Sequence, residues 1–151
     1  MAHPLDQMRI RRQLPNHTYG RVRNQGRRAH QGWDLAAPVG TPLYAVAHGT
    51  IRQISEGGDY GIQITLEFRH SGRRLFAFYA HLSAVECAEG DVVYEGQRIG
   101  LTGRTGNARN LGVQDEHLHF EIRNQARAGR GLRNRIDPGE VLGYEVYSSR
   151  P

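Results

Sequence analysis

The stretch Glu116-His117-Leu118-His119-Phe120-Glu121-Ile122 decides the fold that we expect for this chain. Its apolar and polar residues alternate, which predicts a β-strand with one face on a hydrophobic core. The side chains of His117, His119 and Glu121 then share the other face, with the two imidazoles about 6–7 Å apart. Such a pair could hold a metal, or one histidine could bind metal while the other acts on a substrate. Taken alone, the motif fits a solvent-exposed strand face better.

Length and composition favour one mainly β domain. The chain has 151 residues, 38% of them hydrophobic, with 19 Gly and 6 Pro. This composition indicates short strands joined by turns, with few short helices, rather than a helical bundle. No internal repeat divides the chain, and its single cysteine, Cys87, excludes an internal disulfide. No apolar run is long enough to span a membrane, and we recognise no signal-peptide pattern at the start.

The chain is basic, with a formal net charge of +5, and all 20 of its basic residues are arginine. A basic surface favours polyanions such as nucleic acid, an anionic wall polymer or an acidic membrane. Ordinary solvated charges from an Arg-rich coding bias explain the composition equally well. Because no recognisable nucleic-acid-binding motif is present, we expect no nucleic-acid partner. Residues 1–28 are polar and basic, so we predict an arm packed on a domain formed by residues 29–151.

Two further segments place a histidine beside a predicted strand. His30-Gln31-Gly32-Trp33-Asp34 reads as a loop running into a short strand, and it supplies one nitrogen and one carboxylate. Taken alone, the pair fits a plain His–Asp hydrogen bond or a turn Asp better. In the predicted strand 75–82, alternation places Phe76 and Phe78 on the core face and Tyr79 beside His81 on the other face. A strand pair within residues 43–55, turned at His48-Gly49, is also expected.

Together these segments resemble the lysostaphin-type zinc metallopeptidases of bacterial cell walls. The motifs are His30-Gln31-Gly32-Trp33-Asp34, Tyr79-Ala80-His81-Leu82-Ser83 and His117-Leu118-His119-Phe120-Glu121. The framing segments are Gly40-Thr41-Pro42-Leu43-Tyr44-Ala45, Gly96-Gln97-Arg98-Ile99-Gly100 and Thr105-Gly106-Asn107. The resemblance covers residues 19–142. It implies an antiparallel β-sheet with a substrate groove across it, and hydrolysis of peptide bonds in the stems or cross-bridges of peptidoglycan.

The resemblance also implies roles for individual residues. The zinc ligands would be His30, Asp34 and His119, holding one Zn²⁺ per chain, and His81 and His117 would be the catalytic pair. Three protein ligands leave a fourth position for water, as catalytic zinc sites require. The remaining candidates, for substrate binding or for orienting a ligand, are Tyr79, Glu121 and Asn107. In the family, a short Ser/Thr-Gly-Pro segment usually precedes the His-x-His motif, and residues 110–116 replace it here. This departure bears on substrate preference and not on the metal.

Several alternatives remain open at this point. A catalytically silent wall-binding or hydrolase-activating module could share the fold, although such a module would be expected to lack some of the ligands. A cupin-like oxygenase also uses His-x-His and a carboxylate, but its further histidine follows that motif. The site of action is expected to be secreted or periplasmic without a recognisable signal peptide. This suggests an antibacterial effector delivered to a competitor's periplasm, with an immunity or secretion-machine protein as partner, or a piece of a larger exported protein.

Overall fold

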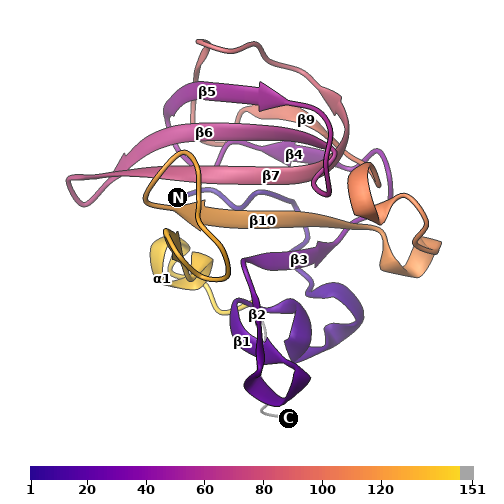
Figure 1. The fold of residues 1–151 in the computed structure, drawn as a ribbon. Coiled ribbons are helices and arrows are strands. Elements are labelled where there is room, and N and C mark those ends of the chain that lie inside the picture. The colour runs from indigo at the N-terminus through magenta and orange to yellow at the C-terminus, as the bar shows by residue number, and fades with distance from the viewer. Residues whose placement is uncertain (147–151) are drawn as a thin grey trace.

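In the computed structural model, which describes residues 1–146, most of the chain forms antiparallel β-strands (Figure 1). The strands are β1 (Gly20–Arg23), β2 (Arg28–His30), β3 (Trp33–Ala36), β4 (Pro42–Tyr44), β5 (Gly49–Ser55), β6 (Ile62–His70), β7 (Arg73–Val85), β8 (Val92–Val93), β9 (Arg98–Thr102), β10 (His117–Arg123) and β11 (Arg135–Ile136). The helix α1 is Pro138–Leu142, and the 3-10 turns are η1 (Arg11–Gln13), η2 (Pro15–His17), η3 (Asn24–Gly26), η4 (Gly106–Ala108) and η5 (Val113–Asp115). The prediction of a mainly β fold with few short helices is confirmed.

Within the described residues, one large sheet has the order β11-β10-β7-β6-β5-β8. Strand β3 also pairs with β10, and β9 pairs with both β4 and β7, while β1 and β2 form a separate small sheet. The predicted pairing of two strands within residues 43–55 is wrong. Strand β4 pairs with β9 and β5 pairs with β6 and β8, because the chain crosses between them instead of turning back at His48.

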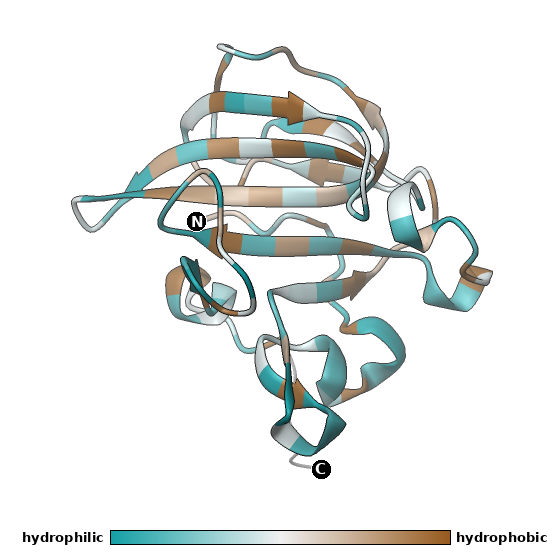
Figure 2. Cartoon of the chain, in the orientation of Figure 1, coloured by the Kyte–Doolittle hydropathy of each residue, from teal (hydrophilic) through white to brown (hydrophobic). Residues whose placement is uncertain are grey.

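Strand β10 lies between β3 and β7 and has the predicted alternation (Figures 1 and 2). Its apolar residues Leu118, Phe120 and Ile122 are fully buried in the core, as expected. The polar face is not exposed, however, because His117 and His119 keep only 4% and 5% of their surface accessible. Other segments therefore cover this face, which excludes the interpretation as a solvent-exposed strand.

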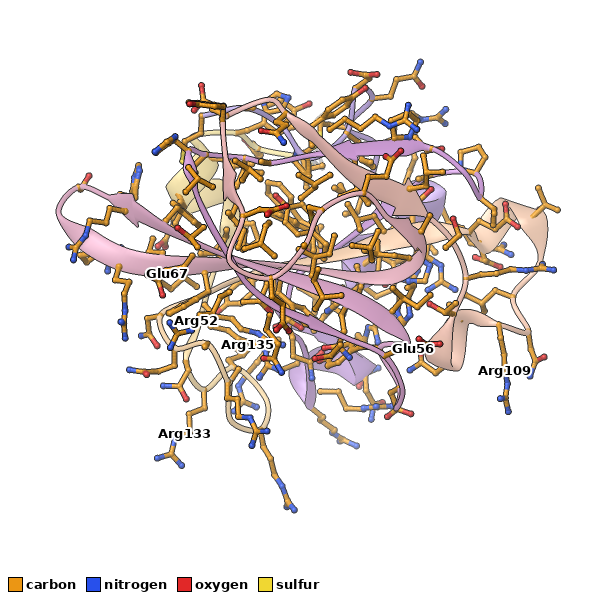
Figure 3. All side chains as sticks on the ribbon, turned by 90° about the horizontal axis from the view of Figure 1, so that it is seen from above. Arg52, Glu56, Glu67, Arg109, Arg133 and Arg135 are labelled. Atoms are coloured by element: carbon orange, nitrogen blue, oxygen red, sulfur yellow. The ribbon has the colours of Figure 1, made fainter. Side chains whose placement is uncertain are left out.

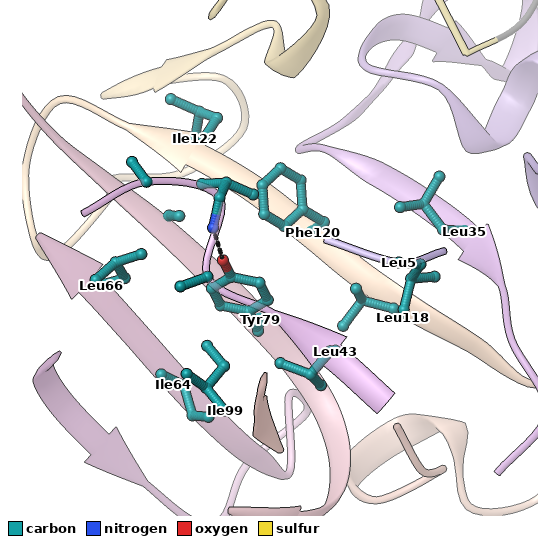
Figure 4. Close-up of a cluster of buried hydrophobic side chains, with 14 of the residues drawn as sticks. Leu5, Leu35, Leu43, Ile64, Leu66, Tyr79, Ile99, Leu118, Phe120 and Ile122 are labelled. Atoms are coloured by element: carbon teal, nitrogen blue, oxygen red, sulfur yellow. Dashed lines mark hydrogen bonds between the residues drawn. The ribbon is translucent and has the colours of Figure 1, made fainter. Parts of the chain in front are cut away.

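The two faces of β7 before His81 are exchanged relative to the prediction. Leu75, Ala77 and Tyr79 belong to the core cluster, whereas Phe76 and Phe78, predicted on the core face, lie opposite Arg123 and Glu121. Tyr79 is fully buried among the core side chains, where its hydroxyl accepts a hydrogen bond from Val46 N and donates one to Tyr44 O (Figure 4). It therefore lies on the opposite face from the histidines, and its proposed role beside His81 is wrong. The cause is a β-bulge: Ile62 pairs with Leu82 but Ile64 pairs with Tyr79, so β7 has one extra residue. His81 takes up that residue with a φ of 62°, which moves its side chain to the other face.

We expect the Tyr79→Phe protein to be less stable by about 1–3 kcal/mol, because Val46 N–H and the Tyr44 carbonyl would lose their shared buried partner. Its zinc content should equal that of the wild type, since the hydroxyl is on the core side of the sheet. Urea unfolding followed by tryptophan fluorescence measures the first quantity and metal analysis the second. A loss of zinc without a loss of stability would contradict this placement of Tyr79.

The first residues of the chain pack against the domain. Leu5 and Ile10 are buried in the core, and Ile10 forms an isolated β-bridge with Leu35. The backbone continues this contact, since Ala36 N donates to Arg9 O and Ala2 N donates to Val46 O. The division of the chain at residue 28 stays a prediction, and β2 spans that position.

Candidate metal centre and active site

The three predicted zinc ligands meet where β2, β3 and β10 come together. Asp34 on β3 is directly opposite His119 on β10, and His30 ends β2. Asp34 Oδ1 lies 2.8 Å from His119 Nδ1 and 3.1 Å from His30 Nε2. All three side chains are buried, and one donor atom of each lies within 4.8 Å of the others. Gly32 permits this approach, because a Cβ there would collide with the carbonyl oxygen of Phe120.

Hydrogen bonds fix which ring nitrogen of each ligand histidine faces the centre. His30 Nδ1 donates to the carbonyl oxygen of Thr18 at 2.9 Å, which leaves Nε2 as the free nitrogen. His119 Nε2 donates to Glu121 Oε2 at 2.7 Å, which leaves Nδ1. A carbonyl or carboxylate behind a histidine is the usual means of orienting a metal ligand. The two histidines therefore present opposite nitrogens to the same carboxylate oxygen.

Asp34 divides its two oxygens between different partners. Oδ1 faces the two ligand histidines, whereas Oδ2 lies 3.2 Å from His17 Nδ1, 3.4 Å from an Arg23 nitrogen and 3.5 Å from an Arg11 nitrogen. Burial alone would raise the pKa of Asp34, but the close contacts of its carboxylate with the imidazoles of His119, His17 and His30 outweigh burial and hold that pKa well below its usual range. Asp34 is therefore a carboxylate whose second oxygen is already oriented.

Glu121 is the group behind His119. Its side chain is fully buried, and it accepts hydrogen bonds from Arg123 Nε at 2.7 Å, Arg135 Nε at 2.8 Å and the Tyr60 hydroxyl at 3.1 Å. Burial raises the pKa of Glu121, but the bond from His119 and the nearby positive charges lower it far more. These contacts support the predicted role of Glu121 in orienting a ligand.

The donor set fits a zinc ion. Two imidazole nitrogens and one carboxylate oxygen are common zinc ligands, and three of them leave room for water. Neutral His30 would present a lone pair to Asp34 Oδ1 at 3.1 Å, and two acceptors repel at that distance unless a cation lies between them. The pKa of His119 supports the same conclusion. Burial lowers this pKa, yet the carboxylates of Asp34 and Glu121 raise it to about 9. The pocket thus favours a positive charge.

The proposed catalytic histidines lie side by side next to this centre. The ring centroids of His81 and His117 are 5.1 Å apart, and His117 Nε2 lies 3.7 Å from Asp34 Oδ1. Each Nδ1 is held at 2.8 Å by a backbone carbonyl, that of Thr105 for His81 and that of Asp115 for His117. Burial lowers the pKa of both, to about 4 for His81. Both are therefore neutral near pH 7, with Nε2 free to accept a proton.

These groups open onto one cavity of about 500 Å³. The lining residues are Arg11, Arg23, Arg28, His30, Gln31, Asp34, Asp59, Tyr60, His81, Asn107, Leu111, His117 and His119. The predicted substrate-side residue Asn107 is among them, and Tyr79 is not. Sequence reasoning missed Tyr60, whose ring stacks on His119 at 5.5 Å. It also missed His17, which has no chemical neighbour in the sequence.

Asp115 connects the start of the chain to His117. Its carboxylate accepts bonds from Arg12 Nε at 2.6 Å and Arg11 Nε at 3.1 Å, while its backbone carbonyl holds His117 Nδ1. The bond from Arg12, followed by that from Arg11, holds the pKa of Asp115 below its usual range. The arginines of η1 therefore fix the loop that positions His117.

Acid should weaken this connection. The pKa of Asp115 is lower in the folded chain than in the unfolded chain, where it is near 3.8. The ionised carboxylate therefore stabilises the fold fully at pH values above 3.8, and this stabilisation is lost as the pH falls toward the pKa of the folded state. We expect the melting temperature to fall more steeply below pH 3.8 in the wild type than in Asp115→Asn. Parallel curves from calorimetry at several pH values would contradict a folding role for this ion pair.

Comparison with known proteins now identifies the class. Residues 28–131 match the family model described as "Peptidase family M23". Because this match covers more than half of the chain, the chain belongs to peptidase family M23, and the lysostaphin-type resemblance is confirmed. The family is zinc-dependent, so Zn²⁺ is the cofactor, in agreement with the His/Asp cluster.

Individual similarities agree with this assignment. The chain is 36% identical over 96 residues to the peptidoglycan DD-endopeptidase ShyA of Vibrio cholerae, covering 62% of this chain and 20% of ShyA. The catalytic domain of the antimicrobial peptidase lysostaphin from Staphylococcus simulans superimposes with a TM-score of 0.62 at 28% identity, covering 86% of this chain and 90% of that domain. A zinc-containing peptidase from Vibrio cholerae superimposes with a TM-score of 0.62 at 28% identity, covering 80% of this chain and 35% of that chain. The chain thus spans about a fifth of the length of ShyA.

Proposed function

We propose that this chain is a zinc-dependent endopeptidase domain that hydrolyses peptide bonds in bacterial peptidoglycan, in the stem peptide or the cross-bridge. The main support is the convergence of three candidate zinc ligands and two neutral histidines on one cavity of about 500 Å³. The substrate is suggested by the similar proteins, since ShyA is named a peptidoglycan DD-endopeptidase.

The residues at the centre divide into those that hold the metal and those that orient them. His30 Nε2, Asp34 Oδ1 and His119 Nδ1 would hold the zinc ion. Bound zinc supplies Lewis-acid chemistry, which polarises an amide carbonyl and activates water near neutral pH. Glu121 fixes the ring of His119 from behind, and the fixed Oδ2 of Asp34 prevents that carboxylate from rotating.

His81 and His117 are the groups that move protons. Hydrolysis of an amide needs a base that takes a proton from water and an acid that protonates the leaving amine. Both histidines enter the reaction neutral because burial lowers their pKa, and each has Nε2 free. The imidazolium formed when one of them takes a proton is an acid that can pass this proton on, or donate a hydrogen bond to the developing oxyanion.

Digestion of purified peptidoglycan tests the proposal. The zinc-loaded protein is incubated with sacculi from a Gram-negative and a Gram-positive bacterium, and mass spectrometry identifies the new amino termini and hence the bond that is cut. New fragments that disappear with a chelator and return with zinc support the proposal. Binding to sacculi without any new fragment would instead favour a catalytically silent wall-binding or hydrolase-activating module.

A narrower form of the proposal places the substrate in another cell. Lysostaphin, to which the fold is similar, is named an antimicrobial peptidase, and we propose that this chain acts likewise as an antibacterial effector in a competitor's periplasm. An immunity or secretion-machine protein would then be its partner. Expression with an added periplasmic export signal should lyse a host cell, whereas cytoplasmic expression should not.

Among the described residues, no helix has the length and hydropathy needed to cross a membrane.

A further inference from the structure

Three arginines, Arg11, Arg23 and Arg28, line the cavity that holds the metal centre. Arg11 and Arg23 both approach Asp34 Oδ2, at 3.5 and 3.4 Å, so each has an acidic partner. The side chain of Arg28 is exposed, and its guanidinium makes no hydrogen bond or ion pair with any residue in the described part of the chain, 1–146. Its guanidinium is therefore available to a ligand in the cavity. Arginines elsewhere, such as Arg109 and Arg133, extend outward into solvent (Figure 3).

The position of Arg28 is fixed relative to the metal centre by β2. Arg28 and His30 are two residues apart on this strand, so their side chains leave it on the same face, about 6–7 Å apart. Both line the same cavity. An anion held by Arg28 would therefore lie within about two residues of extended peptide from a group bound at the metal centre.

Charge also favours an anion at this place. Arg28 is the antiparallel partner of Arg23 in the β1–β2 pair, and like charges opposite one another destabilise a strand pair. The lining contains only Asp34 and Asp59 to balance three arginines and a zinc ion.

We propose that Arg28 binds a free carboxylate of the substrate next to the scissile amide, so that the substrates are anionic stem peptides rather than uncharged glycine bridges. This inference rests on the proposed function. The planar guanidinium of Arg28 suits a carboxylate because it can donate two parallel hydrogen bonds to it. Arg28 is thus a specificity-determining residue outside the set that holds the metal or moves protons.

The test compares two synthetic stem-peptide dimers with the same cross-link. One has free carboxyl groups on the residues that flank the scissile amide, and the other has these carboxyls amidated. We expect kcat/KM of the wild type to be about two- to fivefold higher for the free carboxylate, the scale of one solvent-accessible ion pair. Arg28→Gln should remove this preference through KM, and Arg28→Lys should retain part of it.

Arg27→Gln is the matched control, because Arg27 is also exposed, adjacent in sequence and absent from the cavity lining. It should keep the full preference. A wild type that cleaves both dimers equally well, or an Arg28→Gln protein that keeps the preference, would overturn the inference and leave the peptidase function standing.

Binding of the same dimers to the His117→Ala protein separates the two proposals. Binding that favours the carboxylate and depends on Arg28, without hydrolysis of either dimer by the wild type, would support the carboxylate site and refute the peptidase function. Equal or absent binding of both dimers would overturn the carboxylate site.

Discussion

The His119→Ala protein should fold, contain no stoichiometric zinc, and hydrolyse peptidoglycan fragments on the order of 10³-fold more slowly than the wild type. The expected rate loss follows from zinc's Lewis-acid role, which is worth several kcal/mol. His119 contributes one of the three donor atoms and lies between the carboxylates of Asp34 and Glu121. The measurements are metal content by mass spectrometry, a melting curve, and peptide hydrolysis.

His70→Ala is a suitable control for that experiment, because His70 ends β6 away from the cavity lining. It should keep both zinc and activity. His30→Ala and Asp34→Ala should behave like His119→Ala. One zinc per chain in the His119→Ala protein would show that the ligand assignment is wrong.

The His117→Ala protein should keep its zinc and lose turnover by roughly 10²–10⁴-fold, the usual scale for removing acid–base catalysis. His117 shares a strand face with His119, but its Nε2 lies 3.7 Å from Asp34 Oδ1 while His119 Nδ1 lies at 2.8 Å. His81→Ala should behave in the same way. Affinity for a stem peptide should fall less than the rate, since these groups act mainly as charge develops in the transition state.

The two histidines of the motif therefore differ in the expected zinc content of their alanine variants: His119→Ala loses zinc, whereas His117→Ala keeps it. Zinc loss in His117→Ala together with zinc retention in His119→Ala would mean that their roles are exchanged. Comparable zinc loss in both would mean that the metal is held by four protein ligands, which would leave no open position of the kind that a catalytic site needs.

The central strand could be predicted from the sequence for a simple physical reason, whereas the choice of His30, Asp34 and His119 as zinc ligands rested on the resemblance to a known family. Alternation along residues 116–122 is a local signal, and burial of Leu118 and Phe120 necessarily turns His117 and His119 to the other face. The spacing of His30 and Asp34 is local too, since four residues carry the chain from the end of β2 into β3.

The features that the sequence did not reveal depend on irregular backbone or on distant contacts. Alternation placed Tyr79 beside His81, and the bulge at His81 reversed that result, because one extra residue exchanges the two faces of a strand. Arg11 and His17, which reach Asp34 Oδ2, come from 3-10 turns without periodicity, and Arg23 ends the short strand β1. Tyr60 precedes β6 in a turn, so no pattern indicated that its ring would stack on His119.

Anomalous X-ray diffraction at the zinc edge from crystals of the purified protein tests the assignment of the metal centre most directly. We expect one anomalous peak per chain, bounded by His30 Nε2, Asp34 Oδ1 and His119 Nδ1, with His81 and His117 beside it but not bonded to it. A peak coordinated by His81 or His117 in place of one of these three ligands, or crystals of active enzyme without any peak at this position, would contradict the account.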